Sequence, residues 1–78
     1  MTQEKLNEIV GRNIKKYRLI YNQNHKDKIT QEKLAEAIGS SVSLISNLES
    51  NKINQGISIT NLYKISIILN VPINEFFK

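Results

Sequence analysis

The stretch that decides the fold is residues 31–50, which read QEKLAEAIGSSVSLISNLES. Its first half carries apolar residues at the three- and four-residue spacing of a helix face, namely Leu34, Ala35 and Ile38. Gly39 follows directly, and glycine adopts the left-handed conformation of a tight helix end at little cost. Ile45 and Leu48 then mark the inward face of a second helix. Because only about three residues join the two helices, they must cross at a steep angle, which predicts a helix-turn-helix.

Hydroxyl side chains stand where each of these two helices is expected to begin. Thr30 precedes the first helix, and its oxygen can accept a hydrogen bond from a free amide of the first turn. Only half of a capping box is present, because Lys33 occupies the place of the usual Glu or Gln. Ser40 or Ser41 can cap the second helix in the same way.

The outward positions of the second helix carry only short side chains: Ser41, Val42, Ser43, Ser46, Asn47 and Ser50. Such a helix fits the major groove of DNA, about 12 Å wide, where base edges can be told apart. The helix contains no Arg, Lys or Gln, so bidentate reading of guanine by arginine is excluded within it. Asn47 can pair with adenine, Val42 can contact a thymine methyl group, and serine hydroxyls suit either type of base.

Helical patterns continue on both sides of this motif. Residues 2–21 carry apolar side chains at helical spacing and predict a first helix with Arg12, Lys15 and Lys16 on its solvent side. Gly11 lies inside this helix, where glycine costs about 1 kcal/mol relative to alanine. The wholly polar residues 22–28 are expected to form an exposed loop.

The C-terminal part of the chain completes an all-α prediction. Residues 60–69 predict a fourth helix, and Pro72 is expected to start a short terminal turn or helix. No alternation of apolar and polar residues lasts long enough to build a sheet. We therefore predict one compact five-helix domain over residues 1–78, with the helix-turn-helix at its second and third helices.

Composition and charge narrow the class of protein. Apolar residues make up 40% and charged residues 23% of the 78, which is typical of a globular chain. The net charge of +4 favours a polyanionic partner. Residues 31–50 hold three glutamates against one lysine, a net −2, so the rest of the chain carries +6. Most of any attraction to phosphate must therefore come from outside the motif.

The residues of catalysis and metal binding are missing from the sequence. There is no cysteine, which excludes disulfides, zinc–thiolate sites and thiol catalysis, and the single histidine, His25, lies in the expected loop. The serines have no recognisable base, and no glycine-rich phosphate loop is present. We expect no enzyme activity, no cofactor and no metal. The polar N-terminus is unlike a signal peptide and no apolar run approaches about 20 residues, so we expect a cytoplasmic protein without membrane contact.

Residues 29–39 and 45–49 together resemble the Cro-like phage-repressor (XRE) family of helix-turn-helix transcriptional regulators. The resemblance extends over most of the chain, through residues 10–18, 62–65, 69–72 and 75–77. It implies a regulator that binds double-stranded operator DNA, as a homodimer on a palindromic site. The family includes restriction-modification controllers and phage or plasmid switches, and the sequence does not choose among them.

The resemblance also implies roles for individual residues. The expected base contacts are Ser41, Val42, Ser43, Ser46 and Asn47, and the expected phosphate contacts are Thr30, Gln31, Lys33, Asn51, Lys52 and Asn54. Arg18 and Glu49 match a pair that ties the first helix to the end of the recognition helix. We interpret this pair as structural, because a charge near the core persists only if it is partnered. The loop between Arg18 and Gln31 is several residues longer than is usual for the family.

Apolar residues are abundant in the C-terminal third. Tyr63 and Ile67 lie four residues apart on one helix face, and Phe76 and Phe77 cannot easily both turn inward. The favoured interpretation is a homodimer interface formed by these four residues, and the alternative is core plus incidental exposed side chains. Two other functions stay open: a protein-interaction module that kept the fold without binding DNA, and an antitoxin-like partner whose C-terminal surface binds a second protein.

Overall fold

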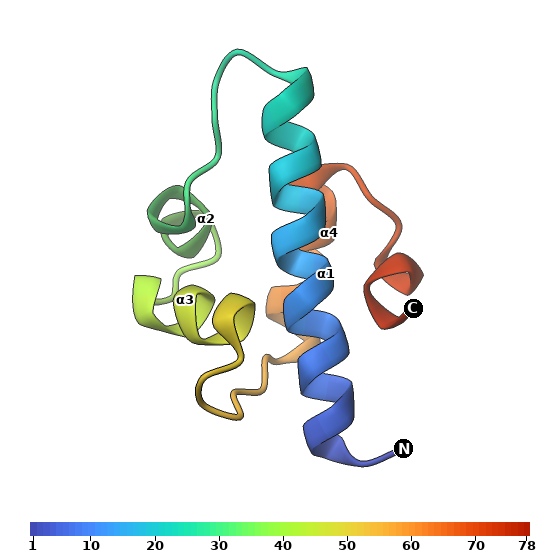
Figure 1. Ribbon diagram of the computed structural model, residues 1–78. Helices are drawn as coiled ribbons and strands as arrows, with labels where there is room; N and C mark the ends of the chain where they lie inside the picture. The colour runs from blue at the N-terminus through green and yellow to red at the C-terminus, as the bar shows by residue number, and fades with distance from the viewer.

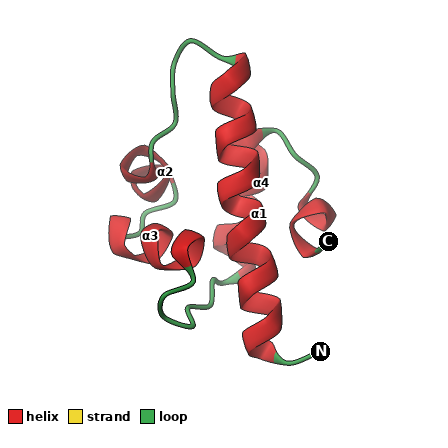
Figure 2. Cartoon of the chain, viewed as in Figure 1, coloured by secondary structure: helices red, strands yellow, loops and turns green.

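A computed structural model of the chain describes residues 1–78, and all of its regular elements are helical (Figures 1 and 2). The elements are α1 (Gln3–Asn24), α2 (Gln31–Ala37), α3 (Val42–Ser50), α4 (Ile59–Leu69) and the 3-10 helix η1 (Ile73–Phe77). The all-α prediction is confirmed, with the difference that the fifth helix is a single 3-10 segment. Figure 1 shows α1 as the long central helix, with α2 and α3 on one side of it and η1 on the other.

The C-terminal end of α1 corrects the prediction made from polarity. The helix does not stop near residue 21 but continues to Asn24, so the connecting loop is shorter than expected. Side chains at the helix end contact its last carbonyl groups. Asn24 Nδ2 donates to the Ile20 carbonyl oxygen at 3.0 Å, and His25 Nδ1 lies 2.9 Å from the Tyr21 carbonyl oxygen. The polar residues of this segment therefore extend an exposed helix rather than end it.

One hydrophobic cluster joins all five elements. The side chains that face inward from α1, α2, α3 and α4 at helical spacing meet η1 in this cluster, and its members are Val10, Ile14, Leu34, Ala35, Ile38, Ile45, Leu48, Leu62, Ile65, Leu69 and Phe76. α1 contacts α3, α4 and η1, whereas α2 packs chiefly on α3. The long first helix is thus the support on which the helix-turn-helix is mounted.

Phe76 is part of this core, and its predicted place in a dimer interface is wrong. Its side chain is 0% exposed, and its ring packs edge-on against Tyr17 with 5.4 Å between the ring centroids. Asn13 Nδ2 also donates to the Phe76 carbonyl oxygen at 2.9 Å, which fixes η1 on α1. Of the two adjacent phenylalanines, η1 turns Phe76 inward and leaves Phe77 40% exposed.

Candidate nucleic-acid interface

The turn between α2 and α3 is built from backbone hydrogen bonds around Gly39. Gly39 has a φ of +70°, a conformation that residues with a side chain rarely adopt. The Ser40 amide donates to the Ala35 carbonyl oxygen at 2.8 Å, and the Gly39 amide donates to that of Glu36 at 3.1 Å. This pair of bonds is a Schellman motif, which satisfies the carbonyl groups at the end of α2. The turn is therefore fixed by its own backbone.

Capping side chains define the start of both helices of the motif. Thr30 Oγ1 accepts from the Lys33 amide at 3.1 Å, and Ser41 Oγ accepts from the Leu44 amide at 3.2 Å. At the other end of α3, Asn51 takes the left-handed conformation with φ +53°, and its amide donates to the Asn47 carbonyl oxygen at 3.0 Å. Asparagine tolerates this conformation better than most residues, so Asn51 ends the helix.

Gly11 allows α3 to lie directly against α1. A methyl group on Gly11 would lie 2.0 Å from the carbonyl oxygen of Leu48, far inside van der Waals contact. Gly11 is buried, and at this point the backbones of α1 and α3 are in direct contact with no side chain between them. From the sequence alone, this glycine is predicted only to lower the stability of the first helix. The close approach that requires it depends on a residue of α3, which local sequence does not reveal.

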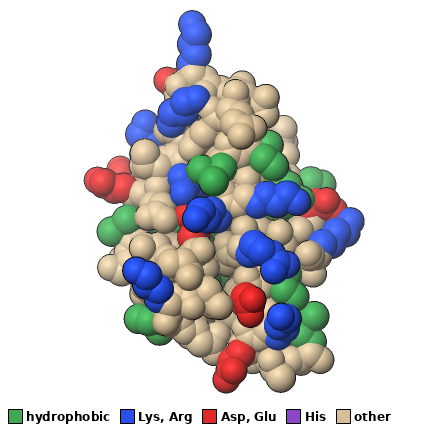
Figure 3. All heavy atoms as spheres, viewed as in Figure 1, with side chains coloured by type: hydrophobic (Ala, Val, Ile, Leu, Met, Phe, Trp, Pro, Cys, Tyr) green, Lys and Arg blue, Asp and Glu red, His purple; other side chains and the backbone are tan.

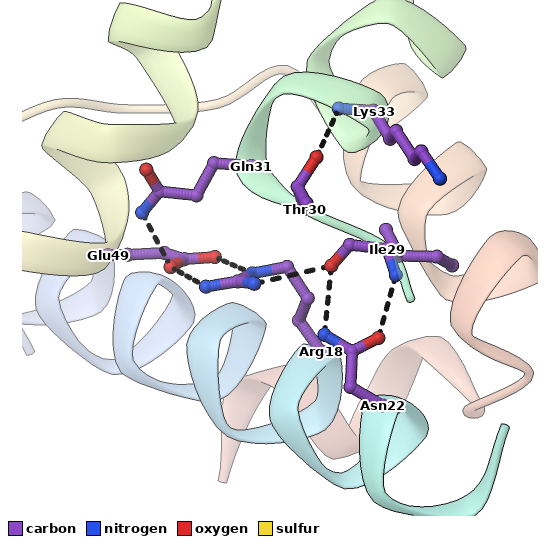
Figure 4. Close-up of polar contacts among 7 residues, drawn as sticks. All are labelled: Arg18, Asn22, Ile29, Thr30, Gln31, Lys33 and Glu49. Atoms are coloured by element: carbon purple, nitrogen blue, oxygen red, sulfur yellow. Dashed lines mark hydrogen bonds and ion pairs between the residues drawn. The ribbon is translucent and has the colours of Figure 1, made fainter. Parts of the chain in front are cut away.

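A network of polar side chains joins α1, α2 and α3 (Figure 4). Arg18 Nε and Nη2 donate to the two carboxylate oxygens of Glu49, each at 2.8 Å, and Gln31 Nε2 donates to Glu49 Oε1 at 2.9 Å. The side chains of Arg18 and Glu49 are 11% and 2% exposed. The hydrogen bond with Glu49 raises the pKa of Arg18 above its ordinary value.

Asn22 fixes the segment that leads into α2, and the sequence did not predict this role. Its Oδ1 accepts from the Ile29 amide at 2.7 Å, while its Nδ2 donates to the Ile29 carbonyl oxygen at 3.0 Å. Arg18 Nη1 also donates to that carbonyl oxygen, at 3.3 Å, as Figure 4 shows. An asparagine among polar neighbours gives no signal of this kind, because its partner lies across a turn.

The outward face of α3 is left without partners inside the chain. Val42, the first residue of α3, is 46% exposed although it is apolar. The side chains of Ser43, Ser46 and Asn47 form no hydrogen bond with the rest of the protein, and no buried polar side-chain atom is unsatisfied. Ser41 is exposed, and its hydroxyl keeps a free proton while its oxygen caps the helix. Of the five residues expected to contact bases, Ser41, Val42 and Ser43 are therefore exposed, while Ser46 and Asn47 are half-buried.

The six residues expected to contact phosphate differ in their present partners. Three of them are used at the start of α2: Thr30 as its cap, Gln31 on Glu49, and Lys33, whose Nζ donates to the Lys28 carbonyl oxygen at 3.3 Å. The other three follow α3, and they are Asn51, Lys52 and Asn54. Asn54 Oδ1 accepts from Asn7 at 3.0 Å, whereas the exposed Lys52 side chain has no partner.

The ion pair between Arg18 and Glu49 reduces the net negative charge of the motif. Glu49 is neutralised by Arg18, which lies outside residues 31–50, so the net −2 of the motif falls to −1 when that pair is counted together. The remaining charges, Glu32, Lys33 and Glu36, all belong to α2, and the outward face of α3 is neutral. Figure 3 shows Lys and Arg side chains spread along the face of the molecule that α1 occupies. Arg12, Lys15 and Lys16 are exposed on that helix.

A second exposed surface runs along α4 and η1. Ile59, Tyr63 and Ile67 follow one another at four-residue spacing and are 64%, 56% and 61% exposed. Phe77 is 40% exposed, and a shallow depression of about 360 Å³ lies beside Tyr63 and Ile67, bounded by residues 70–73. We call Ile59, Tyr63 and Ile67 the α4 stripe. Ile59 was not among the residues predicted for an interface, although it continues the same helical spacing.

The structure contains no group of three or more His, Asp or Glu residues arranged to hold a metal ion. None of the helices combines the length and apolar character needed to cross a bilayer.

Comparison with known proteins gives one family. The family model described as helix-turn-helix matches residues 14–76, which is well over half of the chain and includes the motif, α4 and most of η1. No curated protein matches the chain.

Proposed function

Because this chain belongs to the Cro-like (XRE) helix-turn-helix family of DNA-binding transcription regulators, we propose that it is a homodimeric repressor acting on a palindromic operator. It would control transcription from a nearby promoter, and often its own, in the manner of restriction-modification controllers and of phage or plasmid switches. The observation that carries the proposal is the outward face of α3, which is uncharged and carries the exposed Val42 and Ser43 and the half-buried Ser46 and Asn47, none of them hydrogen-bonded through its side chain inside the protein.

The base contacts belong to this outward face. A recognition helix contacts base edges with residues near its N-terminus. The proposed contacts are the cap residue Ser41, the exposed Val42 and Ser43 of the first turn, and the half-buried Ser46 and Asn47 of the second. The helix itself is mounted rigidly by Gly11 and by the Arg18–Glu49 pair, so its angle of entry into the groove is preset. A preset frame lowers the entropy that is lost on binding.

The phosphate contacts flank the reading helix. Lys52 is the one cation of the segment after α3, and Asn51 and Asn54 lie beside it in sequence. At the start of α2, the proposed contacts are Thr30, Gln31 and Lys33. Gln31 retains one amide proton beyond the one donated to Glu49, so it can serve both partners at once. Because the motif carries a net negative charge, these flanking groups and a second subunit must supply most of the affinity.

The proposed dimer forms through the α4 stripe together with Phe77. The three side chains of the stripe are each more than half exposed and share one face of α4, and an exposed apolar patch is a common mark of an interaction surface. A twofold dimer would use one copy of this surface on each subunit. Dimers of helix-turn-helix proteins bind two half-sites about 34–36 Å apart, with one reading helix in each. Two linked half-sites reinforce each other, which suits a reading helix with few strong contacts.

A salt series of duplex binding tests the proposal. The duplex is first recovered by selection from random DNA, and its affinity is then measured between about 50 mM and about 200 mM salt. A DNA reader loses affinity steeply over this range because bound phosphates release counterions. Lys52→Ala should weaken binding to all duplexes alike and reduce the slope by about one, whereas Asn47→Ala should relax sequence preference and keep the slope.

The matched control for Lys52→Ala is Lys78→Ala, which removes an exposed lysine from the side of α1 opposite to α3 (Figure 1). Failure to bind any duplex at the lowest salt concentration would contradict the proposal. That result would favour the second candidate, a protein-interaction or antitoxin-like module whose partner covers the α4 stripe. The net negative motif and the exposed apolar stripe are the observations in favour of that candidate.

A further inference from the structure

The outward face of α3, which is the proposed reading face, carries only two side-chain groups that distinguish one base pair from another. The hydroxyl groups of its serines both donate and accept, so they suit any base edge. Arg and Lys, which read guanine, are missing from this face. The two discriminating groups are the isopropyl group of Val42 and the amide of Asn47, and both are suited to A·T pairs, through the thymine methyl group and the adenine edge.

Val42 is the one apolar residue on the outward face of α3. It is the first residue of the helix, it is 46% exposed, and it is not part of the hydrophobic cluster. The base edges in the major groove present hydrogen-bond donors and acceptors, and the C5-methyl group of thymine is the apolar group among them that Val42 can contact. An isopropyl group placed on a guanine or cytosine edge displaces water from polar atoms without replacing its hydrogen bonds.

Asn47 lies one turn after Ser43 on the same side of α3 and is half-buried. Its amide oxygen and amide nitrogen have no partner in the protein, so both are available to the N6 and N7 atoms of one adenine. Its main chain is fixed, because its carbonyl oxygen accepts from the Asn51 amide at the end of α3. The amide therefore approaches the groove from a rigid helix rather than from a mobile end.

We propose that the half-site is A·T-rich and that Val42 recognises the C5-methyl group of one pyrimidine within it. This inference rests on the proposed function and names the class of DNA that the same surface selects. It makes the protein sensitive to a single methyl group of the operator. Thymine is bound more tightly than uracil at that position, and 5-methylcytosine more tightly than cytosine, because each pair differs only in the group that Val42 contacts.

The test uses a duplex recovered by selection from random DNA, with each thymine of one half-site replaced in turn by uracil. At one position the replacement weakens binding about fourfold, the equivalent of one buried methylene group. With the Val42→Ala protein the same replacement has no effect. The Leu19→Ala protein, which loses an apolar side chain of similar exposure on α1, keeps the full response and serves as the matched control. At that position, a duplex with 5-methylcytosine is bound about fourfold more tightly than one with cytosine.

Circular dichroism verifies that both variants stay folded, which their exposed positions predict. Selected duplexes that require guanine at the Val42 position, or an equal uracil response in the wild-type and Val42→Ala proteins, overturn the inference and leave the proposed function standing. Failure to recover any duplex overturns both. The two failures are thus distinguished by whether a bound duplex exists at all.

Discussion

The α-carbon of Gly11 lies so close to Leu48 that a methyl group on the glycine would stand 2.0 Å from the leucine carbonyl oxygen. This contact sets how closely α1 and α3 pack, and through α3 it sets the position of the reading face. Neither residue touches that face itself. The angle at which the helix-turn-helix meets DNA therefore depends on a glycine in a different helix.

Replacing Gly11 by alanine should destabilise the protein, although alanine is the better helix former by about 1 kcal/mol. The added methyl group must push α1 away from the backbone of Leu48, and we expect a loss of at least about 2 kcal/mol in the free energy of unfolding. Urea denaturation followed by circular dichroism measures the change. Gly56→Ala is the control, because its methyl group meets only Asn7 at 3.5 Å, and it should stay within about 0.5 kcal/mol of the wild type.

Arg18 and Glu49 should behave as one unit in a double-mutant cycle. Arg18→Met leaves the carboxylate of Glu49 buried and unpaired, which we expect to cost about 3 kcal/mol. Glu49→Leu strands the guanidinium group and also removes the partner of Gln31. The double variant should lose at least about 1 kcal/mol less than the two single losses together. Additive losses in urea denaturation would show that the pair is not coupled.

Asn22→Ala should loosen the segment before α2. The change removes two hydrogen bonds to the backbone of Ile29, and at about 1 kcal/mol each we expect a loss of about 2 kcal/mol. Hydrogen exchange of the Ile29 amide should speed up in the same variant, because its acceptor is gone. Gln23→Ala, at an exposed neighbour without such bonds, should change neither quantity.

The two adjacent phenylalanines should differ sharply in their effect on stability. Phe76→Ala empties a fully buried site and should cost about 3–5 kcal/mol, enough to unfold much of so small a protein. Phe76→Leu, which keeps the fold, should still cost about 1–2 kcal/mol. Phe77→Ala should cost less than about 1 kcal/mol. Thermal unfolding by circular dichroism compares the three, and equal losses at the two positions would contradict the assignment of Phe76 to the core.

A charge in the α4 stripe should separate the proposed dimer. Ile67→Glu places a carboxylate on a side chain that is 61% exposed in the single chain, so the subunit should fold while the interface loses its apolar centre. Sedimentation velocity at high micromolar concentration should then show monomers only. Gln23→Glu adds the same charge at the end of α1 and should leave the dimer intact. A wild-type protein that sediments as a monomer at that concentration would refute the dimer.

The parts of the fold that local sequence determines were predictable. Caps and apolar spacing placed α2, the turn at Gly39 and α3 correctly, because each signal lies within a few residues of the structure that it specifies. The end of α1 was misplaced because side chains such as Asn24 satisfy the terminal carbonyl groups, and polarity alone resembles a loop.

The features that were missed depend on residues far apart in the chain. Gly11 is explained only by Leu48, Asn22 only by Ile29 across the turn, and the inward choice of Phe76 over Phe77 only by α1. Spacing within one helix contains no information about which neighbour another element will bring. The candidate reading residues are different again: their exposure follows from helical spacing, while their contacts with DNA remain predictions.

Val42, Ser43, Ser46 and Asn47, on the outward face of α3, make no side-chain hydrogen bond inside the protein and lie outside its hydrophobic cluster. Substitutions at these four positions should therefore carry little penalty in folding, so the residues proposed to contact bases can vary while the scaffold is retained. Duplicated copies of such a gene can drift apart in their targets while sharing one scaffold.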